Sequence, residues 1–317
     1  MRWRSCWDSI REGLGEMNKR PYRGVFAIPV TPFTEAGAVD ESGLSELVDF
    51  TIAAGAHGLV SPVNASEFSA LSDAERMRVV EIIGAKNADR LPFVAGVSGV
   101  SLQVAVVFAT HAADCGADAI MAMPPYIRKP GAPEIMRYYQ GISDSVDLPI
   151  FVQNYPLPVG VPMRPKFLEE LASQVKNVCY IKEELPPVTH SVAADIKVCG
   201  NLVEGVFGGA AGKYMMNEML RGVAGTMPAC DVADLHAAVW DTYESGDIDQ
   251  ASALFNRLLP LLNFESLYGV NAYKEVLKRR GVIKSAYVRA STVKGLDAED
   301  HTELGRILSS LGDLFKL

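Results

Sequence analysis

The sequence lacks the features that mark membrane proteins, nucleic-acid binders and disordered chains. Its 317 residues contain no apolar run near the roughly 20 residues that a membrane-spanning helix needs. Thirty lysines and arginines stand against 38 aspartates and glutamates, and the resulting net charge of -8 repels phosphate backbones. With 49% hydrophobic residues the chain is too apolar for disorder. We therefore expect a folded protein with no membrane or nucleic-acid partner.

Cysteine and histidine are scarce and scattered. The five cysteines lie far apart without any CxxC pair, and the five histidines show no HxH or HExxH spacing. A disulfide scaffold or a structural zinc site would need closer spacing. We expect a cytoplasmic protein whose chemistry uses no metal and no other cofactor.

The start of the sequence does not look like a targeting signal. Residues 1–16 are basic at the tip but lack the apolar core of a secretory signal. Met17 then opens MNKRPYRGVFAIPVTPF, which reads as a natural start. We interpret residues 1–20 as an N-terminal extension.

Short apolar runs alternate with amphipathic segments along most of the chain. The runs cover residues 25–30, 58–63, 93–97, 119–123, 150–153, 178–181, 203–207 and 223–226. They are continuously apolar, as in parallel strands buried on both faces, and each gap accommodates one helix and two loops. Eight such repeats predict an α/β fold, a (β/α)8 TIM barrel over residues 21–245. A doubly wound sheet is disfavoured because no GxGxxG follows the first run.

The segments between and after the apolar runs carry sequence signals of helices. Ser72 and Glu75 form a capping box ahead of apolar residues at helical spacing. Residues 246–317 hold three further helical patterns, at 251–262, 265–280 and 302–315. We expect a C-terminal helical region that packs against the barrel.

The residues that close the runs are the candidates for chemistry, because active sites of such barrels lie at the carboxyl ends of the strands. Lys182 closes the sixth run, and a lysine is almost never fully buried without a purpose or a partner. Desolvation in a barrel mouth favours the neutral amine, which can form an imine with a ketone. A rim lysine paired with Glu183 or Glu184 fits the spacing equally well. Thr31 and Thr226 close two further runs and are candidates for substrate binding.

Several motifs occur together in the order of a known family. They are AIPVTPF, GLVSPVNASEFSALSDAER, PPYIRKP, LPIFVQNYP and YIKEE. With them the chain resembles the dihydrodipicolinate synthase / N-acetylneuraminate lyase family of class I Schiff-base aldolases. The resemblance implies that Lys182 forms an imine with a 2-keto acid, and that backbone N–H groups of Asn64 and Ala65 hold the carboxylate of this acid. The alternative for these two residues is a turn that serves only barrel closure. The resemblance also implies a homotetramer.

The chain departs from the family at the residues that relay protons. The relay tyrosine at the end of the fifth strand is Gln153 here, and glutamine cannot ionise. The relay threonine is Asn64, and the second relay tyrosine is Ile127. Where the lysine-pathway synthase has an arginine that binds aspartate semialdehyde, this chain has Pro158. The combination of Gln153 at the fifth strand, Lys-x-Glu at the sixth and GTMP at the eighth resembles the sugar-acid dehydratase branch, best known for 2-keto-3-deoxy-L-arabonate dehydratase.

The chemistry of dehydration identifies a further candidate. An imine at C2 of a 2-keto-3-deoxy acid acidifies the C3 protons, and the resulting enamine expels the C4 hydroxyl if an acid assists. One carboxyl group can act as base and acid in turn. Side chains two residues apart on a strand share a face, so Glu184 accompanies Lys182 inward while Glu183 points toward the helices. The alternative for Glu184 is a salt bridge at the rim.

Other conspicuous residues favour structural roles. We interpret Gly208-Gly209 as a tight turn, and Glu67 as a structural hydrogen-bond acceptor. The methionines near residue 217 fit core packing; they are Met215, Met216 and Met219.

Three functions remain open. The first is a Schiff-base lyase that dehydrates a 2-keto-3-deoxy sugar acid, with Lys182, Glu184 and Gln153 as catalytic residues. The second is a related retro-aldolase that releases pyruvate, or a dihydrodipicolinate synthase-like protein of other substrate. The third is a keto-acid sensor, which is disfavoured because a sensor needs no nucleophile.

Overall fold

Eight strands form a closed parallel barrel in chain order, from β1 to β8, in this computed structural model. The structure describes residues 21–289 and 295–317, and the predicted N-terminal extension lies outside them. The predicted fold class, a (β/α)8 barrel followed by C-terminal helices, is confirmed. The strands are β1 (Gly24–Ala27), β2 (Gly58–Ser61), β3 (Phe93–Gly96), β4 (Ala119–Ala122), β5 (Ile150–Asn154), β6 (Val178–Glu183), β7 (Gly205–Gly208) and β8 (Gly225–Thr226).

The chain divides into two compact units, which we describe separately. The first holds residues 21–23, 92–209 and 217–226, and the second holds the remaining described residues. The predicted boundary between a barrel at 21–245 and a helical region at 246–317 stays a prediction.

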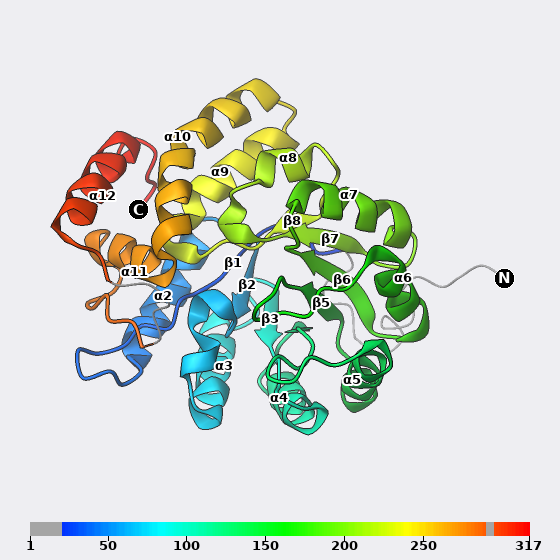
Figure 1. The fold of residues 1–317 in the computed structure, drawn as a ribbon. Coiled ribbons are helices and arrows are strands. Elements are labelled where there is room, and N and C mark those ends of the chain that lie inside the picture. Colours follow the sequence, from blue (N-terminus) through cyan, green and yellow to red (C-terminus); the bar gives the residue numbers. More distant parts are fainter. Residues whose placement is uncertain (1–20, 290–294) are drawn as a thin grey trace. The chain divides into compact units, whose positions relative to one another are not determined.

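The first unit carries strands β3 to β8 (Figure 1). The residues of these strands are almost all buried. Inside it, rings from β5, β6 and β7 pack together: Phe151 stacks on Tyr180 with centroids 4.3 Å apart, and Phe207 meets both edge-on. This aromatic layer fixes the spacing of the strands that carry the candidate catalytic residues. The long helices of the unit are α4 (Leu102–Asp114), α5 (Ala132–Ser145), α6 (Pro165–Gln174) and α7 (Val188–Cys199).

The second unit carries β1, β2 and the C-terminal helices. Its α3 begins with the predicted capping box: the Glu75 N–H donates to Ser72 Oγ at 3.3 Å, and the Ser72 N–H donates to Glu75 Oε2 at 2.9 Å. Helices α10 and α12 lie side by side (Figure 1). The helices of this unit are α2 (Glu41–Ala53), α3 (Asp73–Asn87), α9 (Ala233–Glu244), α10 (Ile248–Tyr268), α11 (Val270–Arg279) and α12 (Ala298–Leu311).

One predicted helix boundary is wrong. We expected separate helices at 251–262 and 265–280, but α10 continues through this gap to Tyr268 with Pro260 inside it. The break falls instead at Gly269, which has a φ of 53° that residues with a side chain rarely adopt. No helix within 21–289 and 295–317 is long and apolar enough to cross a membrane.

Candidate active site

The pairing of β5 with β6 brings three predicted site residues together. Gln153 is the register partner of Lys182 on the neighbouring strand. Glu184 follows β6, and its Oε2 atom lies 3.4 Å from Lys182 Nζ. The Gln153 amide Nε2 donates a hydrogen bond of 2.8 Å to the same oxygen. An ammonium group and an amide N–H therefore meet at one carboxylate oxygen.

This ion pair is almost removed from water. The exposed fractions of the Lys182 and Glu184 side chains are 4% and 9%. Charges interact much more strongly in such a site than at the surface, and a buried pair needs good geometry to offset its desolvation. The hydrogen bond from Gln153 contributes to that geometry.

Glu183 has a different environment from Glu184, as expected from the alternation along a strand. Its Oε2 accepts a 2.6 Å hydrogen bond from Asn154 Nδ2, and its Oε1 accepts one of 2.6 Å from the Leu185 N–H. Burial raises the pKa of Glu183, and the neighbouring Asp195 carboxyl group on α7 raises it further. Glu183 is thus a buried group with its own partners, separate from the Lys182 ion pair.

The loop after β5 is held by the residue next to Gln153. Asn154 accepts a 2.8 Å hydrogen bond from the Met163 N–H and donates one of 2.9 Å to the Met163 carbonyl. This clamp fixes the start of the loop that carries Tyr155. Burial, followed by the charge of Glu184, raises the pKa of the Tyr155 phenol. Tyr155 is therefore a neutral phenol near Glu184, which our sequence reasoning did not single out.

Glu218 is a second acidic residue near Glu184, and sequence reasoning missed it. It lies on the short α8 (Met215–Met219) and is completely buried. A Cβ atom at Gly208 would overlap its carboxyl group, and a Cβ atom at Gly209 would overlap that of Glu184. The two glycines, interpreted as a tight turn, therefore also make room for two carboxyl groups. The signal available in the sequence was one glutamate among buried methionines.

Thr226 ends β8 beside this pair of glycines. It is the register partner of Gly208 and is fully buried. Its hydroxyl oxygen has no hydrogen-bond partner among the described residues. A buried hydroxyl group in this situation calls for an explanation, such as a bound water molecule or a ligand.

The other predicted binding residues lie in the second unit, around the turn that follows β2. Asn64, Ala65 and Ser66 form a 3-10 turn. Thr31 Oγ1 donates a 2.7 Å hydrogen bond to the Ser66 carbonyl, and Ser66 Oγ donates one of 2.8 Å to the Pro29 carbonyl. Thr31 therefore fixes the turn.

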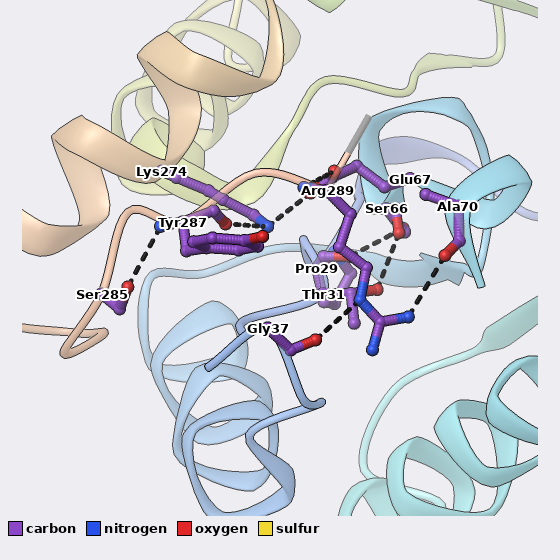
Figure 2. A network of polar contacts seen from close by, with 10 residues as sticks. All are labelled: Pro29, Thr31, Gly37, Ser66, Glu67, Ala70, Lys274, Ser285, Tyr287 and Arg289. Carbon is purple, nitrogen blue, oxygen red and sulfur yellow. Dashed lines mark hydrogen bonds and ion pairs between the residues drawn. The ribbon is translucent and has the colours of Figure 1, made fainter. Parts of the chain in front are cut away.

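Glu67 anchors the end of this turn to the C-terminal part of the chain (Figure 2). It adopts a left-handed conformation with φ 55°, and its carboxylate pairs with the fully buried Lys274. The Arg289 N–H donates a 2.9 Å hydrogen bond to Glu67 Oε2, and Lys274 Nζ donates one of 2.9 Å to the Tyr287 carbonyl. These contacts agree with the predicted structural role of Glu67.

The described residues offer no obvious metal site. Across 21–289 and 295–317, no group of three or more His, Cys, Asp or Glu side chains is arranged to hold a metal ion. The polar groups beside Lys182 are instead the Glu184 carboxylate and the Gln153 amide that donates to it.

Comparison with known proteins identifies the family. Residues 21–311 match the profile of the Dihydrodipicolinate synthetase family. The chain belongs to this family. Its members are lyases of the class I Schiff-base type, and the chain is accordingly an enzyme of that kind.

Individual relatives are similar over most of the chain. The chain is 31% identical to L-2-keto-3-deoxyarabonate dehydratase from Azospirillum brasilense, covering 83% of this chain and 86% of that protein. It is 30% identical to 4-hydroxy-tetrahydrodipicolinate synthase from Methanopyrus kandleri, covering 75% and 79%. The crystal structure of dihydrodipicolinate synthase from Rhodopseudomonas palustris superimposes with a TM-score of 0.85 at 27% identity, covering 93% of this chain and 100% of that one.

The buried ion pair of Lys274 generates a stability prediction. Lys274→Met should lower the free energy of unfolding by about 3–5 kcal/mol, because it leaves the buried Glu67 carboxylate without its cation. Urea denaturation measures the loss. Lys86→Met, which breaks a surface pair with Asp49, is the matched control and should cost at most about 1 kcal/mol. Equal losses in the two variants would contradict a special role for the buried pair.

Proposed function

We propose that this protein is a Schiff-base dehydratase that acts on a 2-keto-3-deoxy sugar acid such as 2-keto-3-deoxy-L-arabonate. The observation that carries the proposal is the contact of Lys182 and Gln153 with one carboxylate oxygen of Glu184. This arrangement holds a nucleophile and an acid–base group but no phenol at the position of Gln153. The 31% identity to an L-2-keto-3-deoxyarabonate dehydratase supports the same reaction class.

Imine formation is the first step of this reaction. The Lys182 amine attacks C2 of the keto acid, the C2 oxygen leaves as water, and a protonated imine remains. Before that attack the ammonium group must give up one proton. Glu184, 3.4 Å away, is the nearest carboxylate that can accept it.

Elimination of water is the second step. Glu184 removes a proton from C3, and the C–H electron pair forms the enamine. The enamine electrons then form the C3–C4 double bond as the C4–O bond breaks, and Glu184 returns the proton it took from C3 to the departing hydroxyl, which leaves as water. Gln153 keeps the Glu184 carboxylate oriented throughout, because its amide donates to the Oε2 atom.

Two neighbouring residues argue against pyruvate release. Retro-aldol cleavage requires a base that removes the proton of the C4 hydroxyl, and the Gln153 amide cannot ionise. Tyr155 is a poor substitute, because its raised pKa keeps the phenol protonated near neutral pH. Pro158, at the position of an arginine in the lysine-pathway synthase, also disfavours condensation with aspartate semialdehyde.

Several further properties remain predictions. We propose that the buried Thr226 hydroxyl binds the substrate, and we keep Thr31, Asn64 and Ala65 as predicted binding residues. The homotetramer and the cytoplasmic location also stay predictions.

Product analysis tests the proposed function. Incubation with 2-keto-3-deoxy-L-arabonate or related 2-keto-3-deoxy acids should give a dehydrated semialdehyde without pyruvate. Pyruvate mixed with aspartate semialdehyde should give negligible turnover. Pyruvate as the main product would instead support the aldolase alternative.

Borohydride trapping tests the nucleophile. Treatment with pyruvate and borohydride should place a reduced adduct on Lys182, because this lysine is buried beside a carboxylate that can accept its proton. Peptide mass spectrometry locates the adduct. Lys182→Arg should abolish trapping, whereas Lys176→Arg, at an exposed surface lysine, should leave it intact. An adduct on another lysine would refute the assignment.

Paired glutamate variants test the acid–base group. Glu184→Gln should reduce dehydration by about 10²–10⁴ while borohydride trapping continues, since a positioned acid–base group contributes about that factor. Glu183→Gln, on the opposite face of the strand, should cost far less. Wild-type turnover in the Glu184 variant would eliminate its proposed role.

A further inference from the structure

The two faces of the β5–β6 pair carry different residues of the candidate site. Gln153 and Lys182 form one register pair and Asn154 and Glu183 form the next, so the two pairs point to opposite faces. Glu184 follows on the face of Lys182, in agreement with their ion pair. Asn154 and Glu183 can therefore influence a reaction at Lys182 only through the residues that they hold in place.

Asn154 is held by every hydrogen-bonding group of its side chain. Its Nδ2 donates to Glu183 Oε2 at 2.6 Å and to the Met163 carbonyl at 2.9 Å, and its Oδ1 accepts from the Met163 N–H at 2.8 Å. Its backbone carbonyl accepts a 3.0 Å hydrogen bond from the Glu184 N–H. The residue is only 1% exposed, so water does not compete for these contacts.

Glu183 closes a turn around Glu184. One oxygen of its carboxyl group is held by Asn154, and the other accepts a 2.6 Å hydrogen bond from the Leu185 N–H. A side chain that bonds the N–H group two residues further on fixes the backbone of the residue between them. The bond from the Glu184 N–H to the Asn154 carbonyl adds a third restraint. The backbone of Glu184 is thus held before, at and after this residue.

The contacts of the Glu184 carboxylate depend on this backbone. Its Oε2 atom lies 3.4 Å from Lys182 Nζ and 2.8 Å from Gln153 Nε2, and Gln153 is itself the neighbour of Asn154 in the chain. A misplacement of about 1 Å can slow a reaction by about 10²-fold. A carboxylate that removes a proton from an imine on Lys182 therefore requires a rigid support.

We propose that Asn154 is a positioning residue of the reaction. Through Glu183 and through the Glu184 N–H, it holds the Glu184 carboxylate in place for removal of the C3 proton. Asn154 itself lies on the opposite face and touches no reacting atom. This inference rests on the proposed function in one respect, the role of Glu184 as the base.

Proton exchange on pyruvate isolates the step that Glu184 performs. On the imine with Lys182, Glu184 takes a methyl proton, the C–H electrons form the enamine, and a deuteron acquired from D₂O returns to the same carbon. NMR measures the rate of this exchange. Borohydride trapping at saturating pyruvate measures the fraction of protein that forms the imine. The exchange rate per trapped molecule therefore reports on Glu184, whatever the fraction of folded protein.

Asn154→Ala removes the side-chain hydrogen bonds and leaves the backbone carbonyl. Exchange per trapped molecule should fall by about 10-fold to 10²-fold, because the carboxylate loses its fixed position. The loss should appear in kcat for exchange. The KM for pyruvate should stay near the wild-type value, because the imine forms on Lys182 and not on Glu184.

Asn177→Ala is the matched control. Asn177 is also 1% exposed, and its Nδ2 donates to the backbone carbonyls of Ser143 and Val146 at 3.2 Å and 2.9 Å. It directly precedes β6, at the opposite end of the strand from Glu184. Both substitutions should lower stability, but Asn177→Ala should leave exchange per trapped molecule unchanged.

Glu183→Gln tests the same contact from its other partner. The new amide keeps an oxygen for the Leu185 N–H but turns an N–H group toward the Asn154 donor. Exchange per trapped molecule should fall less than in Asn154→Ala. The double variant should be no slower than Asn154→Ala alone, because the bond between the two side chains is already absent there.

Several results would overturn the inference. Wild-type exchange per trapped molecule in Asn154→Ala would do so, and so would an equal loss in Asn177→Ala. Trapping and exchange that decline in parallel would leave Asn154 with a purely structural role. If Asn154→Ala does not fold, Glu183→Gln decides, and wild-type exchange in that variant refutes the inference.

Failure of the proposed function gives a different result. A wild-type protein that exchanges the pyruvate protons but dehydrates no sugar acid would refute the dehydratase and leave the positioning role to its own test. A wild-type protein that neither traps nor exchanges pyruvate would refute the role of Lys182, and the inference with it.

Discussion

The register between β5 and β6 is the constraint on which the candidate site depends. Pairing of Gln153 with Lys182 sets the amide and the amine side by side, and the next pair, Asn154 with Glu183, carries the structural contacts. Because side chains alternate along a strand, a slip of one residue would exchange the two sets of groups. The stacked rings of Phe151 and Tyr180 lie on the same two strands and oppose such a slip.

The buried glutamates of this region differ in the groups that they contact. Three glutamates lie close in this region, and each is nearly inaccessible to water. Glu184 meets an ammonium and an amide N–H, Glu183 meets a backbone N–H and a second acid, and Glu218 meets neither kind of donor. In a low-dielectric environment such differences decide which carboxyl group carries the charge. Gly208 and Gly209 leave room for these carboxyl groups, because a side chain at either position would displace Glu218 or Glu184.

The sequence predicts the barrel more completely than it predicts the residues of the candidate site. Continuous apolar runs predict buried parallel strands, and all eight are present. Strand β6 nevertheless extends beyond its apolar run to Glu183, because Lys182 and Glu183 pair with both neighbouring strands, and both are buried although they are polar. Strand alternation was enough to pair Glu184 with Lys182. It could not find Glu218, whose proximity to Glu184 arises from the fold around α8 and not from any local pattern. The ion pair of Lys274 with Glu67 was equally hidden, because these residues are far apart in the sequence.

Gln153 stands at the position of the relay tyrosine of the family, so proton transfer has to use another residue. A phenol at this position could exchange protons with the substrate, whereas an amide can only orient what it touches. Here it orients Glu184, so in the proposed reaction the group that moves protons is a carboxylate two residues beyond the proposed nucleophile and on the same face of its strand. A carboxylate has a much lower proton affinity than a phenolate. It is therefore matched to the acidified C3 proton of an imine and poorly matched to a C4 hydroxyl, which favours loss of water over carbon–carbon cleavage.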